Sequence, residues 1–140
     1  MNYIEILNKS QKELKKYNIP SPALDCEILL SKALNVKREY LLTNLDKKIT
    51  KKEKNFFIRC INRRKKKEPI AYIVGYKEFW KYNFKVNKNV LIPRPDTEIL
   101  VEETIANIPI NSSFRILDVG TGSGCVLLSI LKERKKCLGI

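Results

Sequence analysis

The residues with the clearest chemical potential form a glycine-rich segment, Asp118-Val119-Gly120-Thr121-Gly122-Ser123-Gly124. Because glycine has no side chain, such a loop lets its backbone approach a ligand closely. A P-loop would place lysine after the last glycine, but Cys125 stands there. A dinucleotide loop would usually read Gly-x-Gly-x-x-Gly, whereas here the glycines alternate. The spacing therefore favours a ligand other than a nucleotide phosphate.

Asp118 adds a carboxylate at the end of the apolar segment 115–119, and the apolar run 126–131 predicts a helix whose N-terminus favours an anionic group. S-adenosylmethionine carries an amino group, a carboxylate and a sulfonium, so a carboxylate near its amino end suits it better than it suits phosphate. We therefore predict an S-adenosylmethionine site; the alternative is a structural glycine turn. The predicted cofactor-binding residues are Asp118, Gly120, Thr121, Gly122, Ser123 and Gly124.

Other kinds of active site have little support. The chain has no histidine, which excludes Ser-His-Asp and Cys-His hydrolases. Its four cysteines lack Cys-x-x-Cys spacing, so we expect reduced, packed thiols and no metal site. No catalytic residue can be assigned.

The net charge of +13 favours a polyanion partner such as nucleic acid, or else reflects a general lysine bias, which we prefer. The densest basic run is 63–67. We expect it at a solvated helix end, where cations complement the helix dipole; contact with nucleic acid or another partner is the alternative.

The elements that would position the loop change in character along the chain. Helical spacing predicts helices over 3–17, from Ser21-Pro22 onward, over 37–44, and from the Thr50 capping box to about Lys66. On the first helix Ile4, Leu7, Leu14 and Tyr17 lie near helical spacing. The side chains expected to face the core are Leu24, Ile28, Leu29 and Ala33 on the second helix, and Phe57, Ile61 and Cys60 on the last.

From residue 70 onward the pattern is mixed. Residues 70–75 are β-prone, and 78–80 and 84–86 predict a hairpin around 81–83. A proline-stiffened loop leads to a helix capped by Asp96 or Thr97 and reaching about Asn107. Strand, glycine loop, helix and strand then follow from 115 to 140, which is the first βαβ unit of a doubly wound sheet. No apolar run approaches a membrane span and no signal peptide is evident, so we expect a soluble cytoplasmic protein without membrane contact.

The segment 117–124 resembles the first motif of the HemK/PrmC methyltransferases, which modify a glutamine of peptide chain release factors. The more discriminating similarity is upstream, in the order Glu68-Pro69-Ile70-Ala71-Tyr72-Ile73-Val74-Gly75, Glu78-Phe79-Trp80 and Leu91-Ile92-Pro93-Arg94-Pro95-Asp96-Thr97-Glu98. The resemblance covers the whole chain, although residues 1–65 match by helical layout more than by motif.

The resemblance implies an α-helical bundle that recognises the release factor (1–67), a β-hairpin linker (68–95), and an incomplete α/β Rossmann-like methyltransferase domain (96–140). It suggests that Arg94, Pro95, Asp96 and Thr97 lie near the mouth of the cofactor pocket, the alternative being a rigid inter-domain loop. Two family features are absent: the acidic residue that hydrogen-bonds the ribose, and the Asn-Pro-Pro-Tyr motif that binds the acceptor amide.

We therefore expect the N-terminal part of a release-factor glutamine methyltransferase that is inactive alone and binds S-adenosylmethionine weakly or not at all. Two alternatives stay open: a basic nucleic-acid-binding module, and a methyltransferase acting on a nucleobase amine.

Overall fold

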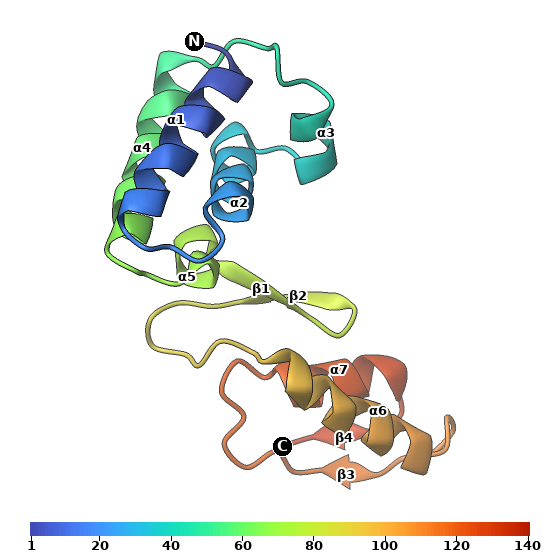
Figure 1. The fold of residues 1–140 in the computed structure, drawn as a ribbon. Helices are drawn as coiled ribbons and strands as arrows, with labels where there is room; N and C mark the ends of the chain where they lie inside the picture. The colour runs from blue at the N-terminus through green and yellow to red at the C-terminus, as the bar shows by residue number, and fades with distance from the viewer. The chain divides into compact units, whose positions relative to one another are not determined.

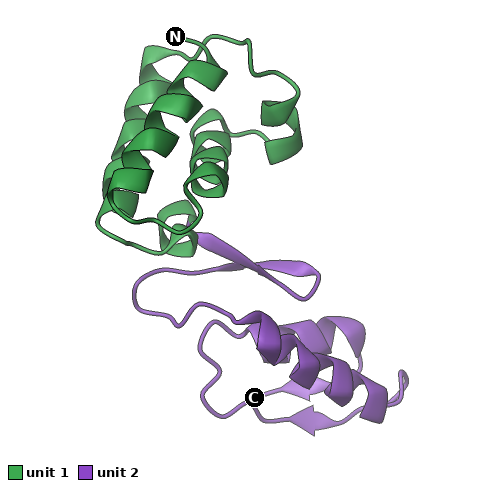
Figure 2. Ribbon diagram, in the orientation of Figure 1, with its two compact units in different colours: residues 1–74 green, residues 75–140 purple.

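The computed structural model describes all residues, 1–140, and divides into two compact units, Met1–Val74 and Gly75–Ile140 (Figure 2). The first unit is entirely helical and the second mixes helices with two small sheets (Figure 1). The finer division into 1–67, 68–95 and 96–140 follows sequence features and stays a proposal.

The first unit contains α1 (Tyr3–Lys16), α2 (Pro22–Leu34), α3 (Arg38–Leu42), α4 (Lys51–Lys65) and α5 (Ile70–Val74). The predicted capping box of α4 is present: the Glu53 amide donates to Thr50 Oγ1, and the Thr50 amide donates to Glu53 Oε2 at 2.8 Å. Asn2 and Glu5 form an equivalent box on α1. Pro22 opens α2 as expected, but Ser21 makes no side-chain cap. Local sequence thus begins these helices at the predicted places.

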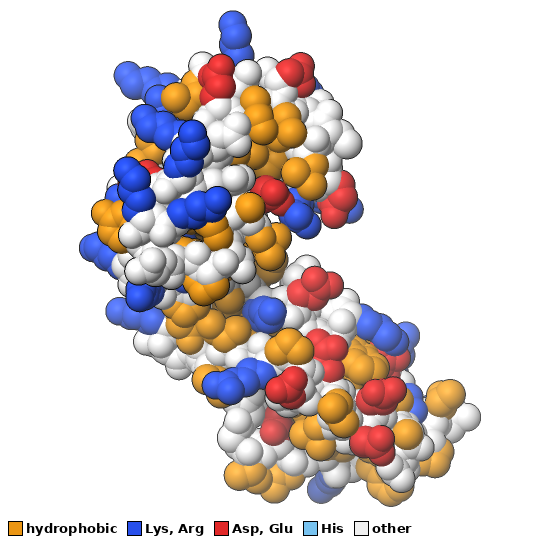
Figure 3. All heavy atoms as spheres, in the orientation of Figure 1, with side chains coloured by type: hydrophobic (Ala, Val, Ile, Leu, Met, Phe, Trp, Pro, Cys, Tyr) orange, Lys and Arg blue, Asp and Glu red, His pale blue; other side chains and the backbone are white.

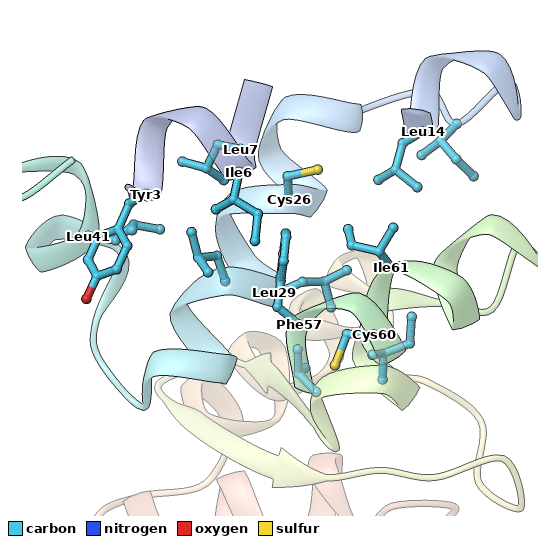
Figure 4. Close-up of a cluster of buried hydrophobic side chains, with 14 residues drawn as sticks. Tyr3, Ile6, Leu7, Leu14, Cys26, Leu29, Leu41, Phe57, Cys60 and Ile61 are labelled. Atoms are coloured by element: carbon cyan, nitrogen blue, oxygen red, sulfur yellow. The ribbon is translucent and has the colours of Figure 1, made fainter. Parts of the chain in front are cut away.

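The core of this unit is a continuous cluster of side chains from all five helices, with Leu14, Leu29 and Phe57 fully buried (Figure 4). The expected inward position of Leu24 is wrong, and Ile4 and Tyr17 do not face the core either, since these side chains are 38–45% exposed. The reason is helix phase: the buried residues of α1 are Tyr3, Ile6, Leu7, Ser10 and Leu14, and those of α2 are Asp25, Cys26, Leu29, Leu30 and Ser31. All four cysteines are free and buried, as expected.

Residues 70–74, expected to be β-prone, form the helix α5 instead. The Pro69 carbonyl accepts hydrogen bonds from the amides of Tyr72 and Ile73, which closes the first turn. Ile73 and Val74 are then buried in the helical core. Tertiary packing on the unit's other helices thus overrides the local β propensity of this apolar run.

The second unit begins with an antiparallel hairpin, β1 (Tyr76–Phe79) and β2 (Tyr82–Lys85). The hairpin lies one to two residues earlier than predicted, and Phe79 pairs with Tyr82 across a two-residue turn instead of a three-residue one. The tight turn is possible because Trp80 adopts a positive φ of 56°. Phe79 and Phe84 pack edge to face, with ring centroids 6.1 Å apart, on the core side of the hairpin.

The rest of this unit comprises the 3₁₀ turn η1 (Pro95–Thr97), α6 (Glu98–Asn107), β3 (Arg115–Ile116), α7 (Cys125–Glu133) and β4 (Leu138–Gly139). Strands β3 and β4 are parallel, which confirms the predicted strand–loop–helix–strand order, although each strand is only two residues long. Thr97 is the N-cap residue of α6, one of the two predicted, but its side chain makes no capping hydrogen bond, because the η1 turn leads directly into the helix. Val101 and Ile130 join Phe79 and Phe84 in a second buried cluster. None of the chain's helices combines the length and apolar character needed to cross a membrane.

Candidate functional site

The candidate site is a pocket in the second unit at the end of β3. Three groups of residues line it: Leu91, Ile92, Pro93, Arg94 and Thr97 before α6; Asp118, Gly120, Thr121, Gly122 and Ser123 of the loop; and Cys125 and Val126 of α7. The Asp118 amide donates to the Ile140 carbonyl at 2.9 Å, which extends the pairing of β3 with β4 by one rung. This bond holds the backbone of Asp118 where the strand passes into the glycine loop.

The glycine loop depends on glycine for its conformation. Gly120, Gly122 and Gly124 have φ angles of 83°, 55° and 75°, a left-handed conformation that costs other residues about 1–2 kcal/mol each. A Cβ added at Gly120 would meet nothing within 4 Å, so there the requirement lies in the backbone alone. The Gly124 amide donates to the Thr121 carbonyl at 2.8 Å, and Gly124 is the N-cap of α7. The loop therefore lines the pocket largely with backbone.

The polar groups of this pocket, one carboxylate and a set of free backbone amides, suit a ligand that carries both an ammonium and a carboxylate. Asp118 Oδ2 is buried and has no hydrogen-bond partner in the chain, which is a costly arrangement for a carboxylate oxygen. An N–H donor from a ligand would satisfy it. On the other side, α7 has no side-chain cap, so the amides of its first turn can receive an anionic group.

The predicted site residues separate into two groups. Five of the six predicted cofactor-binding residues line the pocket, and so do Arg94 and Thr97, whereas Gly124 does not line it. Pro95 and Asp96 are exposed and do not line it. Their assignment to the pocket mouth stays a proposal.

Residues that sequence reasoning missed supply much of the pocket's apolar wall. Leu91, Ile92 and Pro93 come from the segment before α6, while Cys125 and Val126 are the first two residues of α7. The position of Cys125 directly after Gly124 was a usable signal. Nothing in the spacing indicated that residues 91–93 would reach the glycine loop.

The basic run 63–67 is largely engaged within the helical unit. Arg63 pairs with Glu68 through Nε at 2.8 Å, Arg64 Nε lies 2.6 Å from Asp25 Oδ2, and Lys65 Nζ lies 2.7 Å from Glu13 Oε1. The Arg63 guanidinium correspondingly lowers the pKa of the Glu68 carboxyl. Three of the five cations are therefore paired with acids of the same unit. This pairing weakens the case for the basic run 63–67 as a nucleic-acid contact.

Positive charge is nevertheless concentrated in the helical unit. Residues 1–74 hold 18 of the 28 basic and 8 of the 15 acidic residues, a net charge of +10 out of +13. Figure 3 shows many lysine and arginine side chains over the face that carries α1 and α4. The charge therefore lies mainly outside the unit that contains the pocket.

Comparison with known proteins gives consistent matches over most of the chain. A release factor glutamine methyltransferase of Leptospira interrogans is 44% identical over 133 residues, covering 94% of this chain and 46% of that protein. One from Coxiella burnetii is 46% identical over 114 residues, covering 81% and 41%. A bifunctional methyltransferase of Rickettsia felis is 39% identical, covering 92% and 30%. The chain thus spans less than half the length of these relatives.

A family model described as the PrmC N-terminal domain matches residues 5–75. This range covers nearly all of the helical unit and ends at the first residue of the second. The similarity to release factor glutamine methyltransferases continues through the glycine loop, since the Leptospira match covers 94% of the chain. The chain therefore belongs to the PrmC family, and its helical unit is a PrmC N-terminal domain.

Proposed function

We propose that this chain is the N-terminal part of an S-adenosylmethionine-dependent methyltransferase that modifies the side-chain amide of a glutamine in peptide chain release factors. The substrate class is taken from the names of the relatives. The observation that carries the cofactor assignment is the unpartnered, buried Asp118 Oδ2 beside a loop of left-handed glycines. In this proposal β3, α7 and β4 are the first βαβ unit of a Rossmann-like sheet.

The residues at hand fit the cofactor. Asp118 accepts hydrogen bonds from the amino group, and the first amides of α7 receive the carboxylate. Gly120 and Gly122 keep side chains out of the pocket. When bound, S-adenosylmethionine supplies a methyl group activated by a positively charged sulfonium.

The chain's own contribution to methyl transfer is to bind and orient. An amide nitrogen is a poor nucleophile because its lone pair is delocalised into the carbonyl, so positioning matters most and can lower a barrier by roughly 7–11 kcal/mol. Arg94 and Thr97 line the pocket, and in this proposal they lie on the side from which the acceptor approaches. We assign no catalytic residue within 1–140. In the same proposal, 1–67 recognises the release factor, 68–95 connects, and 96–140 holds the cofactor.

A chimera tests the proposal directly. Residues 1–140 replace the matching segment of the Leptospira relative, and transfer of labelled methyl groups to a purified release factor is measured. We expect transfer to the glutamine, and Asp118→Asn should reduce cofactor affinity about 10-fold to 150-fold, the worth of a hydrogen bond to a charged group. Glu102→Gln, an exposed charge change on α6, is the matched control.

Each rival function predicts a different result. A chimera that methylates nucleic acid but no release factor would favour the nucleobase-amine alternative. If residues 1–140 bind nucleic acid tightly with a steep salt dependence, and do not bind release factor, the basic-module alternative is favoured. For the chain alone we expect weak cofactor binding or none and no methyl transfer, so transfer by the unfused chain would contradict that part of the proposal.

A further inference from the structure

The hairpin turn at Trp80 is the most unusual backbone feature of the second unit. Trp80 has a φ of 56°, in the region where a bulky residue costs about 1–2 kcal/mol. The first position of such a two-residue turn normally favours glycine or asparagine. A tryptophan persists in this conformation only where surrounding contacts determine it.

Two carboxylates provide those contacts. The Trp80 amide donates to Glu98 Oε1 at 3.0 Å. Glu133 Oε1 accepts from the Trp80 indole Nε1 at 3.4 Å, from Lys81 Nζ at 2.9 Å and from the Tyr82 hydroxyl at 3.3 Å. Three consecutive residues of the hairpin therefore converge on one carboxylate oxygen, while the backbone of the turn is held by another.

The two acids belong to α6, which directly follows the pocket-lining segment 91–97, and to α7, whose first two residues line the pocket. Glu98 is the first residue of α6 and Glu133 the last residue of α7. The segment 86–97 connects β2 to α6, and five of its residues line the pocket. Its start is held by the Val86 amide on the Gly75 carbonyl at 3.1 Å. Its end is held where Glu98 binds Trp80.

We propose that Glu98 and Glu133 are positioning residues: they lock the Trp80 turn onto α6 and α7, and this lock holds the segment 86–97 against the glycine loop. The inference rests on the proposed function only for the identity of the ligand. The lock itself is a property of the chain without any ligand. The negative charge of Glu98 at the N-terminus of α6 also stabilises that helix through its dipole. The test must therefore separate positioning of the segment 86–97 from general stability.

Trp80 is the chain's one tryptophan, so tryptophan fluorescence comes from this turn alone. We would compare Glu98→Ala, Glu98→Gln and Glu133→Gln with Glu102→Ala as control, because Glu102 is an exposed residue of the same helix. Acrylamide quenching of Trp80 and amide hydrogen exchange of residues 86–97 are measured in the 140-residue chain. Exchange of residues 1–74 serves as an internal reference.

Loss of the Glu98 acceptor should speed exchange in 86–97 about 10-fold to 100-fold, with 1–74 unchanged and quenching of Trp80 increased. Glu98→Gln should restore most of the protection, because its amide oxygen still accepts the Trp80 amide. If Glu98→Ala unfolds the second unit, the Glu133→Gln variant tests the lock instead. Glutamine at position 133 keeps a hydrogen-bond acceptor and removes only the charge that holds Lys81. Increased quenching with a folded α7 then supports the lock.

Two outcomes overturn the inference. One is unchanged exchange in 86–97 and unchanged quenching in Glu98→Ala. The other is an equal acceleration across all of 75–140 in the variants, which would make the acids merely stabilising. Addition of S-adenosylhomocysteine separates this inference from the proposed function. The variants can behave as expected while neither the chain nor the chimera binds S-adenosylhomocysteine. That result would support the lock and contradict the proposed function.

Discussion

Replacing Arg64 by methionine should destabilise the helical unit by about 3 kcal/mol, the lower end of the cost of breaking a buried ion pair. Arg64 Nε lies 2.6 Å from Asp25 Oδ2, and the two side chains are only 15% and 8% exposed. The substitution leaves the Asp25 carboxylate in a nearly dry position beside α4. Each kcal/mol shifts the melting temperature of a domain this size by about 4–8 °C, so a fall of roughly 12–24 °C is expected.

Substitution of the partner, Asp25, and the double variant measure the energetic coupling between Arg64 and Asp25. Asp25→Leu should cost a similar amount, somewhat reduced because Arg64 Nη1 still donates to the Glu68 carbonyl at 3.0 Å. The double variant should be more stable than either single one, since an apolar pair of similar volume often replaces a buried ion pair at little cost. Arg38→Met is the control: Arg38 is 47% exposed in its pair with Glu27, and such pairs contribute less than about 1 kcal/mol.

Urea denaturation followed by far-ultraviolet circular dichroism measures these differences in the helical unit, while Trp80 fluorescence follows the second unit independently. An Arg64→Met variant within about 0.5 kcal/mol of the parent would refute the reasoning, because surface substitutions have effects of that size. So would additive costs in the double variant. Either result would mean that the pair is hydrated and contributes like an exposed one.

Three further predictions concern protonation, thiols and packing. Lys81 lowers the pKa of Glu133. The ionised Glu133 carboxylate therefore contributes its full stabilisation above its unfolded pKa of about 4.3, and this contribution is lost as the pH falls through its lower pKa in the folded chain. Trp80 emission should shift over that acid range and stay constant from pH 5 to 8. Burial raises the pKa of Cys26 to about 12, so its alkylation at pH 8 should be on the order of a thousandfold slower than that of a free cysteine, as peptide mass spectrometry would reveal; comparable rates would contradict its burial. In Gly139→Ala the new Cβ would lie 2.7 Å from Leu131 Cδ1, and overpacking should cost about 1–3 kcal/mol; an unchanged urea midpoint of Trp80 fluorescence would show that α7 yields freely.

Features that depend on neighbours a few residues apart were predictable from the sequence. The Thr50 capping box joins residues three apart, and the parallel β3–α7–β4 unit follows from an apolar strand, a glycine loop and an apolar helix in succession. Five of the six predicted loop residues line the pocket, because consecutive residues of a tight turn cannot separate far. The family resemblance also rested on local motifs in fixed order, and the match of residues 5–75 confirms it.

Features that depend on distant partners were decided by tertiary structure. Residues 70–74 are helical because their apolar side chains fit the helical core, not because the segment prefers helix. Asp25 lies in the first turn of α2, where the helix dipole favours negative charge, yet its partner is Arg64, 39 residues away. Trp80 meets Glu133 across 53 residues, and Leu91 to Pro93 reach the glycine loop across more than 20. Local spacing carries no information on which distant surfaces meet, so the sequence alone determined the order of strand, glycine loop and helix, while packing determined what surrounds and holds the loop.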